Sequence, residues 1–508
     1  MGKRTYIEIM DTTLRDGEQT GGVAFVPQEK LMIARLLLED LRVDRIEVAS
    51  TRVSEGERRA VQLICDWARS CGLLSRVEVL GFVDGSASLN WIREAGGEVI
   101  NLLCKGSRKH CEQQLGKTAE EHLQDIQEVL HAADEMGIGV NLYLEDWSNG
   151  MRHSPEYVFL LMDALQNTSV RRFMLSDTLG ILNPLEVIHF IRRMVSRYPG
   201  KHFDFHAHND YDLAVSNVLG SVLAGAKGLH TTINGLGERA GNAPLASVQA
   251  ILKDHFNAET RINESRLNAV SRLVESYSGV VIPPNKPIVG ENVFTQVAGV
   301  HADGDRKAGL YCNDLLPERF GRMRTYALGK TSGRANIREN IEALGLKLDD
   351  DAMKRVTERI IELGDRKEQV TPEDLPYIIS DVLKHEHTPR KVVLKSYFVT
   401  LAHRLHPMAT LCIEINGKTY EESSSGDGQY DAFVRALRKI YKTALKRTFP
   451  MLINYAVTIP PGGRTDALVQ AVITWQHNGQ IFRTRGLDAD QTEAAIQATI
   501  KMLNIIEE

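Results

Sequence analysis

The chain of 508 residues has few cysteines, no long apolar run and no large excess of one charge. Its six cysteines form no Cys-x-x-Cys pair, which is typical of reduced thiols in an intracellular protein. No apolar run reaches the length of about 18 residues that a membrane span needs, so we expect none. The net charge of −5 gives no basic footprint for nucleic acid. These absences are those expected of a soluble globular protein without a membrane span or a nucleic-acid footprint.

The first residues also lack a targeting segment. Met1–Tyr6 has no apolar signal core, and Tyr6 stands where N-myristoylation needs Ser or Thr. We therefore expect a cytoplasmic location. The composition, 43% apolar and 25% charged, is that of a globular protein, and the length exceeds that of one ordinary core. Several domains are predicted.

Short apolar segments alternate with amphipathic helical patterns over the first 235 residues. Eight segments are predicted as strands: Tyr6–Met10, Arg45–Ala49, Arg76–Gly81, Val99–Leu103, Gly139–Leu144, Arg172–Ser176, His202–His206 and Gly228–Thr232. Eight strand–helix units in series predict a parallel (β/α)8 TIM barrel. An open doubly wound sheet is the alternative, but no glycine-rich phosphate turn follows the first strand.

The pattern changes after the barrel. Helical stretches and loops fill the middle of the chain, and a β-rich segment after Pro389 repeats a βββα unit twice. We expect an α/β protein with a catalytic barrel at 1–275, helical linker subdomains at 276–388 and a C-terminal βββα-repeat regulatory domain at 389–508. The repeat carries no catalytic cluster, which favours a sensor or dimerisation role.

A barrel places its chemistry on the loops that follow its strands. His206 and His208 stand at i and i+2 near the end of the seventh strand, so both imidazoles point to one face. Two such imidazoles form half of a divalent metal site, although a histidine at a strand end is often only solvated or hydrogen-bonded. Asn234–Asn242 is a glycine-rich loop after the last strand, suited to close backbone approach or to a simple turn.

Three motifs together resemble one enzyme family. They are Asp11-Thr12-Thr13-Leu14-Arg15-Asp16-Gly17-Glu18-Gln19, His206-Ala207-His208-Asn209-Asp210 and the loop Asn234–Asn242. As a set they resemble the acetyl-CoA-dependent 2-alkylmalate synthases, which are metal-dependent Claisen-condensing barrel enzymes. The segments Gly81–Gly85, Asn101–Ser107 and Tyr143–Gly150 are most similar to the citramalate synthases of that family.

The resemblance implies an acyltransferase with acetyl-CoA as co-substrate. It favours condensation with pyruvate to (R)-citramalate in isoleucine biosynthesis. The alternatives are a 2-isopropylmalate synthase, which uses 2-oxoisovalerate in leucine biosynthesis, and a related metal-dependent lyase. A non-catalytic metal-binding regulatory protein is a third class.

The resemblance also assigns residues to the metal. Asp16, His206 and His208, with Asn242 as a weaker ligand, are implied to bind Mn²⁺, Zn²⁺, Mg²⁺ or Co²⁺. The alternative for Asp16 is a helix cap after the first strand.

The remaining assignments concern catalysis and substrate binding. Arg15 would stabilise negative charge that develops on oxygen, and Glu145 would do the acid/base work at the acetyl methyl group, with help from His301 and Tyr311. The Thr178 hydroxyl would hold the oxo-acid carboxylate. The side chains that narrow the oxo-acid pocket, so that a methyl group fits and an isopropyl group is crowded, are Leu80, Leu103 and Tyr143.

In the family, the segment with His301 and Tyr311 reaches into the barrel of a second subunit, so a homodimer is expected. The citramalate-type pattern has Asn where this chain has Gly309. His301 and Tyr311 have an alternative interpretation as ordinary surface residues, and Glu145 has one as a structural ion-pair partner.

The C-terminal repeat resembles the allosteric amino-acid-binding domain of the family, with isoleucine or leucine as effector. The residues predicted to line the effector site are Tyr430, Asp431, Leu452, Tyr455 and Ile459. Their alternative role is plain domain core.

Overall fold

The computed structural model describes residues 5–49, 54–256, 258–298, 300–301, 304–305, 309–344, 346–365, 370, 374–375, 378–379, 382, 391–401, 405–458 and 469–507. The chain divides into two compact units. The first contains 1–295 and 308–325, and the second contains 296–307 and 326–508. In the described part of the chain, no helix is both long and apolar enough to cross a membrane.

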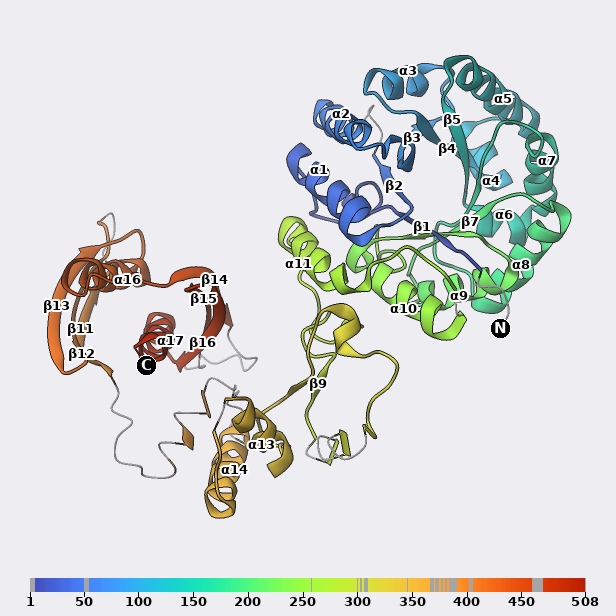
Figure 1. Cartoon of the computed structure of the whole chain (residues 1–508). Helices are drawn as coiled ribbons and strands as arrows, with labels where there is room; N and C mark the ends of the chain where they lie inside the picture. Colours follow the sequence, from blue (N-terminus) through green and yellow to red (C-terminus); the bar gives the residue numbers. More distant parts are fainter. Residues whose placement is uncertain are drawn as a thin grey trace. The chain divides into compact units, whose positions relative to one another are not determined.

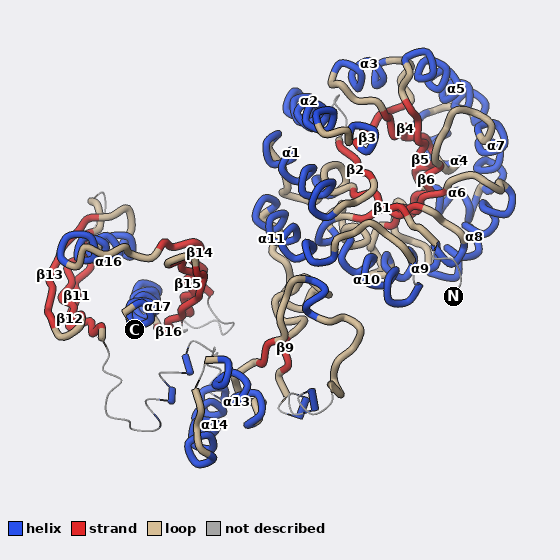
Figure 2. Tube along the Cα trace, viewed as in Figure 1, coloured by secondary structure: helices blue, strands red, loops and turns tan. Residues whose placement is uncertain are grey.

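Eight parallel strands of the first unit close into a barrel in the order β1 to β8. They are β1 (Glu8–Asp11), β2 (Arg45–Val48), β3 (Val77–Phe82), β4 (Val99–Lys105), β5 (Gly139–Glu145), β6 (Phe173–Asp177), β7 (Phe203–Ala207) and β8 (Gly228–Thr231). Figure 2 shows them as an inner ring inside a ring of helices. The predicted TIM barrel is confirmed, and the doubly wound sheet is excluded because β1 pairs with β8.

The helices follow the strands in sequence and surround them (Figure 1). They are α1 (Pro27–Arg35), α2 (Glu55–Ser70), α3 (Ala87–Glu94), α4 (Arg108–His110), α5 (Ala119–Met136), α6 (Trp147–His153), α7 (Pro155–Leu165), α8 (Pro184–Arg197), α9 (Ala214–Ala224), α10 (Leu245–Phe256) and α11 (Leu267–Ser278). Their ends follow capping rules. Thr118 and Glu121 form a capping box at the start of α5, and Gly137 ends that helix in the left-handed conformation. The main apolar core lies between strands and helices.

The amino-terminal end of the barrel interior is ionic. Arg45 of β2 is buried and contacts three carboxylates, at 2.6 Å from Asp204, 3.1 Å from Glu78 and 3.3 Å from Glu8. Arg172 adds a second cation, 2.9 Å from Glu8. Buried charges are stable only when they are paired, so these side chains form one interdependent network.

The second unit contains a small helical part and a β-rich part. The helices α13 (Arg334–Ala343) and α14 (Asp350–Asp365) share their own small apolar core. The short strands β9 (Thr295–Gln296) and β10 (Thr325–Tyr326) pair at the division between the two units.

The β-rich part has the predicted two βββα copies. The first is β11 (Val392–Thr400), β12 (Met408–Ile415), β13 (Lys418–Ser425) and α16 (Gln429–Lys439); the second is β14 (Met451–Thr458), β15 (Val469–His477), β16 (Gln480–Asp488) and α17 (Gln491–Ile506). Both sheets are antiparallel, and the first strand of each has a register shift at the matching place, Leu394/Ser396 and Leu452/Asn454. The two copies share one apolar core.

Candidate active site

Asp16 lies in the turn that follows β1. The backbone N–H of Asp16 donates to Thr12 O at 2.8 Å, and Thr13 N–H donates to Asp11 Oδ1 at 2.9 Å, so the segment folds back tightly on the strand end. This turn buries the Asp16 carboxylate completely. The helix-capping alternative receives no support, because the Asp16 side chain makes no capping hydrogen bond.

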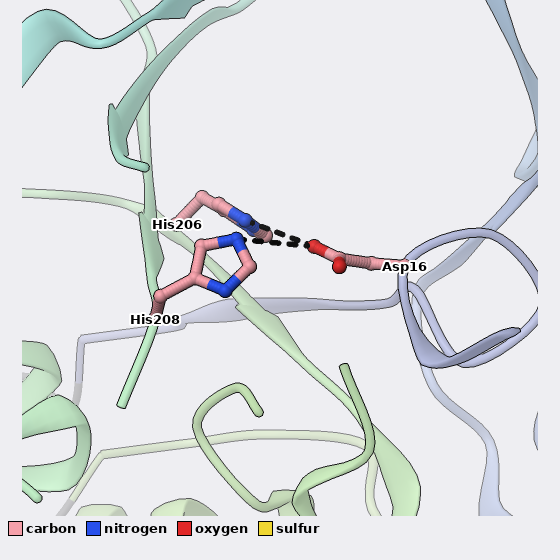
Figure 3. Close-up of side chains that lie close together, drawn as sticks. All are labelled: Asp16, His206 and His208. Atoms are coloured by element: carbon pink, nitrogen blue, oxygen red, sulfur yellow. Dashed lines mark ion pairs between the residues drawn. The ribbon is translucent and has the colours of Figure 1, made fainter. Parts of the chain in front are cut away.

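His206 and His208 meet Asp16 from β7 and the loop after it. The Nε2 atoms lie 3.1 Å and 3.6 Å from Asp16 Oδ2 respectively, and Figure 3 shows both imidazoles pointing at that carboxylate. One ligand atom from each of the three residues falls within 4.8 Å of the others. The two-residue spacing therefore places both rings on one face, as the sequence predicted.

Asn242 joins this cluster through the glycine-rich loop. It forms an isolated β-bridge with His208, and its Nδ2 donates to Leu236 O at 3.1 Å. The close approach requires glycine, because a Cβ atom at Gly237 would lie 2.1 Å from Asn242 Nδ2. Its Oδ1 is buried without a hydrogen-bond partner in the described structure.

The charge states suit a cation. Burial opposes ionisation of Asp16, but Arg15 and the two imidazoles hold its pKa well below the usual range. Burial lowers the pKa of His206 and lowers that of His208 to about 4, so both rings are neutral near pH 7. Neutral imidazoles, a carboxylate and the partnerless buried oxygens Asp16 Oδ1 and Asn242 Oδ1 are a donor set that fits Mn²⁺, Zn²⁺, Mg²⁺ or Co²⁺.

Arg15 is fixed beside the cluster. Its Nη1 lies 3.1 Å from Asp16 Oδ2, its Nε donates to Glu47 Oε2 at 2.6 Å, and its Nη2 donates to the Tyr143 hydroxyl at 3.2 Å. Burial disfavours the cation, but Glu47 and Asp16 raise its pKa above the usual value. The guanidinium is thus a permanent positive charge in a fixed orientation.

A series of hydrogen-bonded polar side chains extends from Arg15 through the barrel interior. The Tyr143 hydroxyl donates to Glu47 Oε2 at 3.2 Å and lies 3.1 Å from His230 Nδ1, and His230 Nε2 lies 3.1 Å from Asp204 Oδ2. This series of side chains connects Arg15 to the ionic end of the barrel interior. Sequence reasoning missed His230. Its only signal in the sequence is that a histidine stands inside a predicted strand.

The three predicted pocket residues do come together. Leu80 and Leu103 pack against a small buried cluster of Met10, Tyr143 and Met174. Leu103, Tyr143 and Met174 are register partners on β4, β5 and β6. The Tyr143 and His206 ring centroids lie 6.1 Å apart, so this apolar cluster borders the group formed by Asp16, His206 and His208.

Glu145 and Thr178 stand at the ends of neighbouring strands. Glu145 is 23% exposed and forms an ion pair with Lys105 at the end of β4. The Thr178 hydroxyl accepts a hydrogen bond from the backbone N–H of Asp146 at 2.8 Å, which leaves its own proton for another acceptor. Lys105 is a site residue that sequence reasoning named only within a motif.

The other predicted residues lie elsewhere in the chain. Tyr311 belongs to the first unit and is exposed, whereas His301 belongs to the second. In the C-terminal repeat, the rings of Tyr430 and Tyr455 lie 5.2 Å apart, and both tyrosines and Leu452 pack against the shared apolar core. Asp431 is 2.8 Å from Arg435.

Ile459 lies outside the described residues. The Tyr430 hydroxyl lies 2.7 Å from Thr499 Oγ1 of the second copy, so the aromatic pair lies where the two copies meet.

Comparison with known proteins covers almost the whole chain. The HMGL-like family model matches residues 6–274, the homocitrate synthase post-HMGL domain-like model matches 288–368, and the LeuA allosteric (dimerisation) domain matches 369–507. A solved HMG-CoA lyase from Bacillus subtilis shares the barrel fold, with a TM-score of 0.50 and 21% identity over 56% of this chain and 97% of that one.

Curated relatives extend over the full length. A putative (R)-citramalate synthase from Methanopyrus kandleri is 34% identical over 98% of this chain and 96% of its own length. The (R)-citramalate synthase of Methanocaldococcus jannaschii is 33% identical over 98% and 99%. A probable 2-isopropylmalate synthase from M. kandleri is also 33% identical, over 98% of both chains. The chain therefore belongs to the 2-alkylmalate synthase family, enzymes that condense acetyl-CoA with a 2-oxo acid by acyl transfer.

Proposed function

We propose that this enzyme condenses acetyl-CoA with pyruvate and water to give (R)-citramalate and CoA, a step toward isoleucine. The observation that supports the choice of pyruvate is the apolar cluster beside the proposed metal ligands, to which Leu80, Leu103 and Tyr143 belong. In the proposal these side chains would occupy the space that a larger side chain of the oxo acid needs. Sequence identity alone does not choose, since relatives named for both activities match almost equally well.

Asp16, His206, His208 and Asn242 are the residues that would hold a divalent metal. When bound, such an ion supplies a Lewis acid that polarises the keto group of the oxo acid. Its proposed position explains why two buried side-chain oxygens, Asp16 Oδ1 and Asn242 Oδ1, have no hydrogen-bond partner among the described residues.

The protein's own residues manage protons and charge. Glu145 takes a proton from the acetyl methyl group, and the carbon so activated forms a bond to the keto carbon of pyruvate. Arg15 stabilises the oxygen on which negative charge develops, and that oxygen then takes up a proton. Water cleaves the thioester and releases CoA as a thiol. The Thr178 hydroxyl donates to the pyruvate carboxylate and fixes its orientation.

The proposal extends to assembly and control. The match to a LeuA allosteric (dimerisation) domain supports a homodimer, in which His301 and Tyr311 complete the acid/base machinery. We assign an amino-acid effector to Tyr430, Asp431, Leu452, Tyr455 and Ile459, with the Tyr430–Tyr455 ring pair at the centre. The proposed location is the cytoplasm, where the free cysteines of the chain would stay reduced.

The test is release of CoA thiol from acetyl-CoA with a series of 2-oxo acids. We expect kcat/KM for pyruvate to exceed that for 2-oxoisovalerate by at least ~30-fold, because crowding of each of the two added carbons is worth ~1–3 kcal/mol. A preference for 2-oxoisovalerate contradicts the choice of pyruvate. Thiol release with none of the oxo acids, together with cleavage of a 3-hydroxyacyl-CoA, would instead identify a lyase.

A second measurement tests the metal ligands. Asp16→Asn preserves the shape of the side chain and removes its charge, so bound metal and activity should be lost together. Asp40→Asn is the matched control, because Asp40 pairs with Arg266 and, in the described part of the chain, has no contact with the proposed metal ligands. Full activity of metal-free Asp16→Asn protein contradicts the assignment.

A further inference from the structure

Asp146 has an unusual backbone conformation next to the proposed acid/base residue. It follows Glu145 at the end of β5, begins α6 and has φ 62° and ψ 27°, in the left-handed region. Residues other than glycine are strained there unless surrounding contacts hold them, and such strain gathers at functional sites. The Asp146 carboxylate is also fully buried, which is rare unless the group is paired, and its Oδ2 lies 3.4 Å from His110 Nε2.

Three consecutive residues at and just after the end of β4 contact Glu145 and Asp146. Lys105 forms an ion pair with the Glu145 carboxylate, Gly106 N–H donates to Glu145 O at 2.6 Å, and the Ser107 hydroxyl donates to Asp146 Oδ2 at 2.7 Å. These contacts fix the Glu145 backbone and its side chain at the same time.

Two glycines show how closely the segments are packed. A Cβ atom at Gly106 would lie 2.8 Å from Glu145 O, and one at Gly150 would lie 2.0 Å from Gly106 O. The middle of α6 therefore packs backbone against backbone on the residue that follows β4. Asn149 of α6 closes the arrangement, since its Nδ2 donates to Asp146 Oδ1 at 2.8 Å.

Asp146 also reaches the third segment of this edge. Its backbone N–H donates to Thr178 Oγ1 at 2.8 Å. That bond uses the acceptor side of the hydroxyl and turns its proton away from β5. The left-handed conformation of Asp146 sets the direction of this N–H, so a change in φ would move the Thr178 hydroxyl as well as Glu145.

We infer that Asp146 is a positioning residue. It holds two side chains in fixed relative positions: Glu145, the proposed proton acceptor, and Thr178, whose hydroxyl donates to the pyruvate carboxylate. Ser107 and Asn149 hold Asp146 in place. The inference rests on the proposed function, because it takes the roles of Glu145 and Thr178 from there. Among the described residues, the side chain of Asp146 contacts Ser107, Asn149 and His110 and neither the proposed metal ligands nor Arg15, so its effect falls on proton transfer and substrate orientation and leaves metal binding unchanged.

The experiment is a pair of double-mutant cycles, with Asp146→Ala combined with Glu145→Gln and, separately, with Thr178→Val. Alanine removes both side-chain acceptors and disfavours the left-handed backbone. We expect Asp146→Ala to lower kcat ~100-fold, the loss expected when reacting groups shift by about 1 Å. In the Glu145→Gln background the same substitution should cost little further activity, because it acts through Glu145.

The controls separate positioning from general damage. Bound metal and the KM for acetyl-CoA should stay at wild-type values in Asp146→Ala, and Asp146→Asn, which tolerates the left-handed conformation, should restore most of kcat. Asp212→Ala is the matched control, since Asp212 also has a positive φ of 58° on a loop of this barrel edge and bonds only Asn209 in the described structure. It should retain full activity.

Two results would overturn the inference. One is an Asp146→Ala effect of equal size with and without Glu145→Gln and with and without Thr178→Val. The other is loss of metal from Asp146→Ala protein. If Asp146→Ala fails to fold, Ser107→Ala replaces it in both cycles. A fully active Glu145→Gln enzyme contradicts the acid/base role in the proposed function, and the Thr178 cycle then decides for Asp146 alone.

Discussion

Leu103→Ala should widen the substrate preference of the enzyme. Leu103 is the register partner of Tyr143 and packs on the apolar cluster beside His206, one of the proposed metal ligands. The substitution removes an isopropyl group from this cluster. 2-Oxoisovalerate carries an isopropyl group where pyruvate carries a methyl group, so it needs space for two more carbons. The two added carbons of that substrate are worth ~1–3 kcal/mol each in a hydrophobic pocket. Relief of their crowding should therefore shift the kcat/KM ratio toward 2-oxoisovalerate by at least ~30-fold.

The assay measures thiol release with each oxo acid at saturating acetyl-CoA. Leu102→Val is the control, because Leu102 points to the opposite face of β4 and packs in the core beneath the helices. It should lower the melting temperature and leave the ratio unchanged. The reasoning is refuted if Leu103→Ala folds and binds metal, yet shows the wild-type ratio.

Three further predictions concern stability and the polar interior. Burial raises the pKa of Asp11 to about 7, so the folded state favours its protonated form and the free energy of unfolding should fall as pH rises from about 4 through 7. Asp11→Asn should remove that part of the pH dependence, on the order of 3 kcal/mol between pH 5 and pH 8, in denaturant titrations at these two pH values; equal pH dependence in both proteins contradicts this. His230→Phe removes a hydrogen-bond partner from both the Tyr143 hydroxyl and Asp204, so it should destabilise the barrel by ~1–3 kcal/mol and lower kcat with metal still bound. An unchanged kcat would exclude a catalytic role for the series of side chains from Tyr143 to Asp204. Mn²⁺ at 100 times its Kd should stabilise the metal-free enzyme by ~2.7 kcal/mol and should not stabilise Asp16→Asn, as thermal melts would show; an equal response in both would place the ion elsewhere.

The sequence predicts the barrel well because its signals are local. Strands buried on both faces are short apolar runs, such as Val99–Lys105, and the helices between them have caps and one apolar face. The repeat of the C-terminal domain was visible for the same reason. The sequence predicted that His206 and His208 share one face because they are two residues apart, and the family motif supplied Asp16; that the three bind a metal stays a prediction.

The contacts that sequence reasoning missed depend on which strands are neighbours and on their register. His230 meets Tyr143 across 87 positions, and Lys105 meets Glu145 across 40. No periodicity in the chain reports such pairs. The left-handed backbone of Asp146 was equally hidden, because an aspartate after a strand is an ordinary helix-start signal.

The network around Arg45 has a consequence for how this barrel changes over evolutionary time. Removal of one member leaves an unpaired charge in the interior, which costs ~3–5 kcal/mol, about as much as a domain can lose. Arg45, Glu78 and Asp204 are therefore expected to vary as a group or stay fixed. Divergence in substrate choice has to come from the apolar cluster and the loops, where single replacements are tolerated.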